Sequence, residues 1–407
     1  MNATAERLIG VAEARRRVLA EPVALPCEEV GLDAALGRVL CEDVASEGPL
    51  PPFDASAMDG FVARAGPAGE LEVVGESRAG RPAEGVLEAG RAMRISTGAM
   101  VPNGGEAVVP VERAEVARGP AGGSAERVRL PARATGDHIR RAGEDLGAGE
   151  LLLRVGHRMG PPEVAALAAA GRAAVACGGV PRVAVLSTGD ELVAPGRPLA
   201  PGQVRDSNAP ALAALAARAG ARVGLRAHVR DDPAQTVAAL REALDGADVV
   251  CIAGGVSVGE HDHVKRALAE LGVARRFWGV ALKPGKPTWF GVRGSTLVFG
   301  LPGNPVSAIV TFGLFVGPAL ARLAGARDAL PAPTYATLAE PVERHRSREQ
   351  AVRCRIEQGP DGALARPTGP QGSHRITSLL NADALLLVGA GDGELAAGAR
   401  VELEPLL

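Results

Sequence analysis

Hydrophobic and polar positions are spaced differently in different parts of the chain, and this spacing predicts the elements. From residue 181 to residue 323, short apolar runs alternate with stretches whose apolar residues recur at helical spacing. The runs predict strands at 183–186, 223–229, 248–253, 277–282 and 297–299, and the stretches predict helices at 209–217, 233–244, 263–271 and 304–323. Strands that alternate with helices in this way predict a parallel α/β domain.

The flanking regions show a different pattern. Residues 5–19 and 161–170 have the character of helices. Elsewhere the apolar runs are short and separated by Gly and Pro turns, which predicts strands at 61–63, 71–74, 107–111, 128–130, 336–338, 351–356, 384–388 and 401–403. We therefore expect a small β module between residues 51 and 140 and a barrel-like C-terminal domain.

Composition narrows the class of protein. With 407 residues the chain is long enough for two to four domains. A net charge of −2, with 45 basic and 47 acidic residues, argues against nucleic-acid binding, and so does an aromatic content of 2%. We find no signal-peptide core and no apolar run near the ~18–20 residues of a membrane span, so we expect a soluble, cytoplasmic protein without membrane contact.

The five cysteines are scattered and form no C-x-x-C pair: Cys27, Cys41, Cys177, Cys251 and Cys354. We expect them to be small buried residues in a reducing compartment rather than disulfides or a zinc site.

Three Gly- and Pro-rich loops follow predicted strands, at 254–262, 283–287 and 301–305. Ligands of open α/β sheets bind at strand ends, and two of the chain's three lysines, Lys283 and Lys286, share one rigid loop there. The loops therefore predict an anionic, phosphate-bearing ligand, with these candidate binding residues: Gly254, Gly255, Ser257, Pro302 and Asn304.

Paired carboxylates also follow strands of the α/β region. Asp190 and Glu191 come after the strand at 183–186, and Asp231 after the strand at 223–229. Since parallel strand ends meet at one edge, these acids predict, with Asp262, a site for Mg²⁺, which prefers carboxylate oxygens. The metal ligands that we predict are Asp190, Glu191 and Asp262.

A serine hydrolase is an alternative interpretation of the same loop. Residues 255–259 match G-x-S-x-G after a strand, and His374 follows in the order that such enzymes use, so Ser257 is a candidate nucleophile. A nucleoside-triphosphate loop is excluded, because Glu260 stands where lysine is required.

Nine short motifs occur in order along nearly the whole chain, at 52–61, 96–99, 140–145, 187–192, 206–208, 254–262, 283–287, 300–307 and 372–374. Together they resemble the molybdopterin molybdenumtransferases, the family that includes the gephyrin E domain. The resemblance implies insertion of molybdate into adenylylated molybdopterin with release of AMP, Mg²⁺ dependence and an elongated homodimer with its site near the subunit interface. It also implies contacts with the pterin adenylyltransferase and with enzymes that accept the cofactor.

The resemblance further implies domain bounds and residue roles. The expected domains are an extended dimerisation domain at 1–50 and 140–177, a β-rich lid at 51–139, an α/β molybdopterin-binding domain at 178–327 and a β-barrel at 328–407. The implied catalytic residues are Asp59, Thr97, Asp145, Glu191, Asp231 and Asp262. The implied molybdate-side residues are Lys283, Lys286, Ser307, either Arg348 or Arg353, and Ser373.

A pterin-binding scaffold without turnover is a second alternative, since the family includes a member with an anchoring role. The presence of Asp59, Asp262 and both lysines argues for catalysis. The related pterin adenylyltransferase lacks the β module and the barrel.

Overall fold

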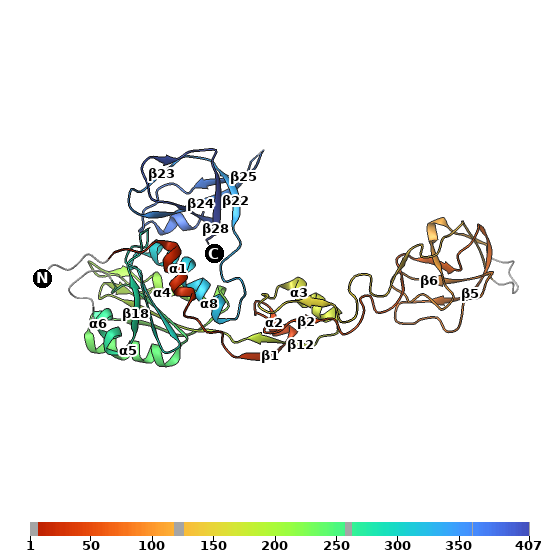
Figure 1. Cartoon of the computed structure of the whole chain (residues 1–407), viewed down its shortest axis with the longest axis horizontal. Coiled ribbons are helices and arrows are strands. Elements are labelled where there is room, and N and C mark those ends of the chain that lie inside the picture. Colours follow the sequence, from red (N-terminus) through yellow and green to blue (C-terminus); the bar gives the residue numbers. More distant parts are fainter. Residues whose placement is uncertain (1–6, 118–125, 257–262, 360, 407) are drawn as a thin grey trace.

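The structure, a computed structural model, describes residues 7–117, 126–256, 263–359 and 361–406. The molecule is elongated (Figure 1). An α/β domain and a β-barrel lie at one end, a slender arm leads away from them, and a β module lies at the far end of the arm. The chain passes along the arm twice, because the module is inserted between the arm's two halves.

A six-stranded sheet forms the centre of the α/β domain. The strands lie in the order β16 (Arg222–Val229), β13 (Arg182–Thr188), β17 (Val249–Ala253), β21 (Thr296–Leu301), β20 (Trp289–Arg293) and β18 (Ala274–Trp278). The first four run parallel, and β20 and β18 are antiparallel to their neighbours. From β13 the chain passes to β16 on one side and then crosses to β17 on the other side of β13. This change of direction creates the switch point where ligands bind in such sheets.

Helices cover both faces of this sheet. On one face α5 (Pro233–Gly246) packs against α6 (His263–Glu270), and Leu240 and Val264 join Leu186 and Ile252 in a buried core. On the other face lie α1 (Val11–Leu19), α4 (Asn208–Arg218) and a long C-terminal helix. Strands buried from both sides contain continuous apolar residues, and β17 is buried at every position.

The long helix consists of α7 (Pro305–Thr311), a π-helical turn (Phe312–Val316) and α8 (Gly317–Leu323). With 19 residues and a mean hydropathy of 1.7, it is long and apolar enough to cross a membrane, so our expectation that no segment reaches this length was wrong. Its apolar stretch is 72% buried inside the protein, where Phe315 and Leu320 are fully covered. Burial on all sides explains the composition, since a helix at the centre of a domain is apolar all round.

The C-terminal strands form a closed barrel. The order is β24 (Glu349–Gly359), β25 (Gly362–Pro367), β22 (Thr334–Leu338), β28 (Arg400–Pro405) and β26 (Ala384–Val388), and β26 pairs back with β24. A short strand of the α/β domain, β19 (Leu282–Lys283), adds in parallel to β24 and places Lys283 opposite Gln350. This pairing holds the barrel against the lysine loop.

The arm is narrow and contains little regular structure: β1 (Cys27–Gly31) with β12 (Ala174–Gly178), β2 (Val44–Ala45) with β11 (Leu151–Leu153), α2 (Leu32–Ala35) and α3 (Pro161–Ala169). Cys27 and Cys41 form a disulfide, so the prediction of reduced cysteines was wrong for this pair. The reason is β12, which pairs with Cys27 through Gly178 and binds the backbone of Cys41 through Ala176. Cys177, Cys251 and Cys354 are free and buried, as predicted.

The module at the end of the arm contains a second six-stranded sheet. Its order is β7 (Ala107–Pro110), β4 (Gly60–Ala63), β6 (Arg91–Ile95), β5 (Gly69–Ser77), β9 (Arg127–Leu130) and β8 (Glu115–Ala117). β4 is buried on both faces: Phe61 packs into one apolar cluster and Val62 into another. The remaining short elements are spread over the whole chain. They are β3 (Ala55–Ser56) with β10 (Ile139–Arg140), β14 (Leu192–Val193) with β15 (Val204–Arg205), β23 (Val342–Glu343) with β27 (Glu394–Leu395), and 3-10 turns at Val111–Arg113 and Ile376–Leu379.

The predicted fold class is confirmed, with local corrections. The expected strand at 277–282 is two strands, because Gly279 has φ +85° and breaks the extended chain between them. The expected helix at 5–19 begins at Val11, and residues 1–6 lie outside the described chain. β6 and β20 were not predicted from the sequence.

Candidate functional site

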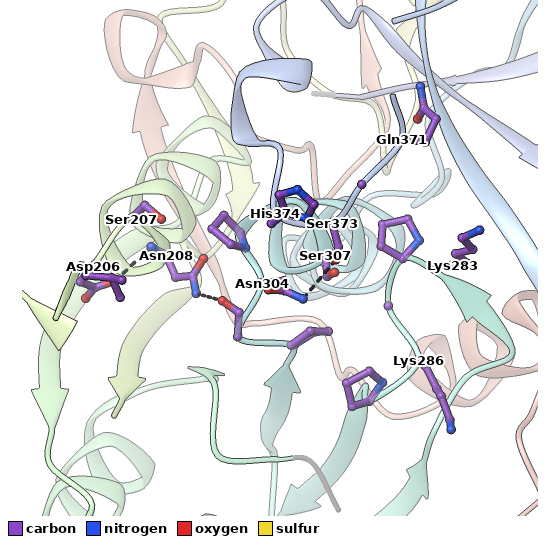
Figure 2. Close-up of a pocket in the computed structure, with 18 of the residues that line it drawn as sticks. Asp206, Ser207, Asn208, Lys283, Lys286, Asn304, Ser307, Gln371, Ser373 and His374 are labelled. Carbon is purple, nitrogen blue, oxygen red and sulfur yellow. Dashed lines mark hydrogen bonds between the residues drawn. The ribbon is translucent and has the colours of Figure 1, made fainter. Parts of the chain in front are cut away.

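A cavity of about 950 Å³ lies where the parallel strands end and the barrel meets the α/β domain. Figure 2 shows Asp206, Ser207 and Asn208 on one side, the two lysines on the other, and Asn304, Ser307 and Ser373 between them. Eight of the residues predicted from the sequence line this cavity: Glu191, Lys283, Lys286, Pro302, Asn304, Ser307, Arg348 and Ser373. Six separate segments of the chain therefore meet here.

The lysine loop has a fixed shape. The hydroxyl of Thr288 donates to the carbonyl of Gly285 at 2.6 Å, and the backbone of Val280 donates to that of Lys286 at 3.0 Å. A Cβ on Gly285 would lie 2.8 Å from side-chain atoms of Leu282 and Thr311, and φ there is +129°, so the position requires glycine. The loop thus holds both ammonium groups on a rigid support.

These cations have no carboxylate partner in the part of the chain that the structure describes. Among the described residues, none of the carboxylates lies within 4.0 Å of the charged nitrogens of Lys283, Lys286 or Arg348. Three unpaired cations that line one cavity produce a positive potential, and such a cavity attracts anions.

Two helix N-termini add partial positive charge at the same place. Ser207 and Asn208 begin α4, and Asn304 stands directly before α7. The Asn208 amide donates to the carbonyl of Gly303 at 2.7 Å, and the Asn304 amide donates to the hydroxyl of Ser373 at 3.1 Å. These bonds join the α4 segment, the loop after β21 and the barrel loop around one cavity.

The structure separates the two candidate arginines. Arg348 lines the cavity, whereas Arg353 does not and is 0% exposed. Within the described chain, Nε and Nη1 of Arg353 have no hydrogen-bond partner, and Nη2 donates to the carbonyl of Gly372 at 3.5 Å. Burial lowers the pKa of Arg353 from its usual value. A buried guanidinium with unused donors beside the 371–373 loop has capacity for a further acceptor.

The predicted acidic residues of the α/β domain lie close together. The backbone N–H of Asp190 donates to the carboxylate of Asp231 at 3.4 Å, and that of Asp231 donates to Asp190 at 3.3 Å. The Glu191 carboxylate lies over Gly189, where a Cβ would be 2.3 Å from its oxygen. Carboxylate oxygens of this kind are the ligands that Mg²⁺ prefers in proteins. The described residues contain no group of three His, Cys, Asp or Glu side chains at metal-binding distance. Asp262 lies outside them.

The glycines of the first loop permit close packing behind this edge. Gly254 and Gly255 have φ of +90° and +64°, and a Cβ on Gly255 would lie 2.6 Å from Val264. The backbone of Gly254 donates to Leu301 at 3.1 Å. Ser257, the candidate nucleophile of the hydrolase interpretation, lies outside the described residues.

The remaining predicted site residues are not at the cavity. Asp59 and Thr97 lie together in the distal module: the Asp59 carboxylate accepts from the Thr97 backbone at 2.6 Å and from its hydroxyl at 3.0 Å. These two hydrogen bonds lower the pKa of Asp59. Asp145 is exposed where the arm meets the module. Figure 1 places the module at the opposite end of the molecule from the α/β domain and the barrel, whose residues line the cavity.

The sequence interpretation left several cavity residues out of its site. Asp206 accepts from the backbones of Asn208 and Ala209, both at 3.0 Å, and from the Ser187 hydroxyl at 2.6 Å, so it orients the start of α4. Gln371 lines the cavity, and its amide is bonded to both backbone groups of Arg353. The polar residues at 206–208, directly before a helix, were the signal available for Asp206. No feature of the sequence marked Gln371.

A doubly covered sheet with a cavity at its switch point, lined by cationic side chains, defines an α/β protein with a binding site suited to an anionic ligand. Family models give the specific assignment. The MoeA N-terminal region (domain I and II) matches residues 9–171, the probable molybdopterin binding domain matches 184–322, and the MoeA C-terminal region (domain IV) matches 335–406.

Relatives support the same assignment. The molybdopterin molybdenumtransferase of Haemophilus influenzae is 35% identical over 404 residues, which cover 97% of each chain. Molybdopterin molybdenumtransferase 2 of Mycobacterium tuberculosis is 36% identical over 95% of this chain and 97% of its own. A solved molybdopterin biosynthesis moeA protein from Pyrococcus horikoshii superposes with a TM-score of 0.82 at 29% identity, over 98% of this chain and 100% of that chain. The chain belongs to the molybdopterin molybdenumtransferase family, whose members are enzymes of molybdenum cofactor biosynthesis.

Proposed function

We propose that this protein inserts molybdate into adenylylated molybdopterin, with release of AMP and in the presence of Mg²⁺, in the cytoplasm. The observation that carries this proposal is a group of cavity cations, among them Lys283, Lys286 and Arg348, that have no carboxylate partner in the described chain. Molybdate is a tetrahedral dianion, so its binding requires fixed cationic donors that are not already neutralised by carboxylates.

Residues of the cavity have distinct roles in this proposal. Lys283, Lys286 and Arg348 hold the oxyanion by charge-assisted hydrogen bonds. The hydroxyls of Ser307 and Ser373 donate to its remaining oxygens, and Ser373 is oriented by the amide of Asn304 at 3.1 Å. Arg353, with two unused donors behind the 371–373 loop, is available to the same anion after a small movement of that loop.

The acidic edge handles the adenylyl group. Asp190, Glu191 and Asp231, with Asp262, would hold Mg²⁺, which when bound neutralises the negative charge that builds up on the pyrophosphate. The same carboxylates orient a water molecule and accept its proton as it attacks the pyrophosphate, so that AMP leaves. The loop that follows Gly254 offers the backbone N–H of Gly255 to the phosphates.

We further propose that the protein acts as a homodimer. Asp59, Thr97 and Asp145 do not line the cavity of their own chain, and the module lies at the far end of the arm (Figure 1). A two-fold axis that places the distal module of one copy over the cavity of the other would bring the two sets together at each of two equivalent sites. The pterin substrate would come from the pterin adenylyltransferase, and the product would pass to cofactor-accepting enzymes.

The test is incubation of the purified protein with adenylylated molybdopterin, molybdate and Mg²⁺, with AMP measured by chromatography and molybdenum by mass spectrometry. The proposal predicts AMP release that depends on molybdate, with molybdenum retained on the pterin. Pterin binding without AMP release would favour the scaffold alternative. Neither binding nor release would reopen the hydrolase alternative, which labelling of Ser257 with an active-site serine reagent would test.

A further inference from the structure

The turn before β24 contains a histidine bonded to the cavity arginine. The Nη2 of Arg348 lies 3.0 Å from the Nε2 of His345, and the backbone N–H of Ser347 lies 3.2 Å from Nδ1. Arginine and backbone N–H groups are donors only, and a neutral imidazole has a single unprotonated nitrogen, so only one of the two contacts can be a hydrogen bond to the ring. In the tautomer with its proton on Nδ1, that bond runs from Arg348 to Nε2. A doubly protonated ring could accept neither bond.

The turn itself is fixed next to the lysine loop. The backbone of Glu349 donates to Ala281 at 2.8 Å, and β19 then pairs with β24. On the other side, the backbone of Gly391 donates to the carbonyl of His345 at 3.1 Å. The backbone of His345 is therefore held independently of its side chain, and the ring is a support placed next to a cavity cation.

The charged groups around the ring oppose its protonation. Arg348 and Lys283 act on it from the cavity side, while Arg344 donates to the Gly389 carbonyl at 3.2 Å and Arg346 pairs with Asp392 at 3.4 Å. Burial, together with the charges of Arg348 and Lys283, lowers the pKa of His345 below its ordinary value of 6.5. The ring is consequently neutral at pH 7 and can act as an acceptor.

We infer that His345 is a positioning residue, whose neutral ring accepts a hydrogen bond from Arg348 and thereby keeps that guanidinium in the wall of the cavity, where it meets the oxyanion. The inference rests on the proposed function for the identity of the anion. Arg348 has a long flexible side chain and, in the described chain, no carboxylate partner, so without the ring it would lose its fixed orientation. A preorganised cation costs less entropy on binding than a mobile one.

Two variants separate positioning from a general structural effect. His345→Leu removes the acceptor, whereas His345→Gln keeps one, because the glutamine side-chain carbonyl can accept from Arg348. The KM for molybdate should rise about tenfold in the leucine variant, as for loss of one hydrogen bond to a charged group, with kcat and the KM for the pterin nearly unchanged. The glutamine variant should recover most of the loss. His157→Gln, which alters a histidine bonded to Glu163 in the arm, is the matched control.

Acidification provides a second readout. As the pH falls below the lowered pKa of His345, the wild-type ring gains a proton and loses its acceptor, so the wild-type KM for molybdate should rise relative to that of His345→Gln. If the wild-type KM for molybdate falls on acidification instead, the protonated ring attracts the anion directly. That result would overturn the positioning role. Equal KM values in the wild type and in His345→Leu would also overturn it.

A crystal structure of His345→Leu tests the inference without any turnover. The guanidinium of Arg348 should be displaced from the cavity wall, and an unmoved guanidinium would overturn the inference whatever the activity. Absence of molybdate-dependent AMP release from the wild type would instead count against the proposed function alone.

Discussion

The distal module and the cavity use charged residues in opposite ways. In the module, several arginines are paired with carboxylates, for example Arg127 with Glu70 at 2.6 Å and Arg91 with Glu88 at 2.9 Å. At the cavity, Lys283, Lys286 and Arg348 have no such partner in the described chain. Exposed pairs contribute little to stability and leave no net field, whereas clustered unpaired cations cost stability and attract anions. This difference indicates that the cavity, and not the paired arginines of the module, is suited to bind an anionic ligand.

One carboxylate of the module that lacks a cation partner among the described residues complements the cavity. The exposed carboxylate of Asp59 has no cation at salt-bridge distance among the described residues and is oriented instead by Thr97. Two hydrogen bonds hold it ionised, since they lower its pKa. An oriented acid at one end of the molecule and unpaired bases at the other would combine only if two chains meet.

The largest expected effect comes from the lysine loop. Lys283→Ala combined with Lys286→Ala should reduce molybdate-dependent AMP release by more than about 100-fold, because two fixed charge-assisted donors are lost. The melting temperature should stay within a few degrees of the wild type, because neither lysine has an ion-pair partner among the described residues. Arg127→Ala, which breaks an ion pair of the module, is the matched control and should retain full activity. A double lysine variant with wild-type kinetics would contradict the proposed anion site.

A smaller effect is expected at Thr97. Thr97→Val removes the hydroxyl donor to Asp59 but keeps the backbone donor, so we expect a loss of about tenfold in kcat/KM. The loss of one bond to the ionised form raises the pKa of Asp59 toward its ordinary value of 3.8, so the acid limb of the pH–rate profile should move to higher pH. Thr97→Ser should behave like the wild type, and an equal loss in the serine variant would show that the hydroxyl does not act through Asp59.

The smallest expected effect is on thermal stability. It concerns Glu349, which follows Arg348 in sequence and lies where the barrel meets the α/β domain. Burial, opposed by the charge of Arg15, raises the pKa of this carboxyl above 4.5. The folded state then binds a proton that the unfolded state releases, so stability falls as pH rises from the unfolded pKa through the folded one. Glu349→Gln should therefore raise the melting temperature at pH 7 and leave it unchanged near pH 4, measured by thermal denaturation at both values. A lower melting temperature at pH 7 would contradict this account.

The sequence predicted local features better than distant relations. Periodicity located the strands β13, β16 and β17, and the Gly-Pro pattern around Lys283 and Lys286 correctly predicted a rigid loop at the edge of the sheet. β20 was not recognised because its apolar run follows the lysine loop and precedes another strand, without a helix between them. The disulfide was also missed, since the proximity of Cys27 and Cys41 depends on β12, about 140 residues away in sequence.

The candidate site shows the same limit of prediction from sequence, which does not reveal how distant residues are placed. The sequence motifs indicated Asp59 and Lys283 together as parts of one site, yet one chain keeps them in separate regions. Motif order along a chain contains no information on which copy contributes a residue, and the arm that separates the two regions is recognisable only in three dimensions. The sequence likewise left Arg348 and Arg353 as alternatives, and burial distinguishes them.

The most direct test of the central claim is complementation between two inactive variants, Asp59→Asn and Lys283→Ala. Each alone should lack molybdate-dependent AMP release. After the two are mixed, unfolded and refolded together, half of the dimers are mixed, and each mixed dimer contains one intact site, so activity should return to about a quarter of the wild-type value. Persistent inactivity of the mixture, with dimers verified by light scattering, would contradict a site built from the distal module of one chain and the cavity of another.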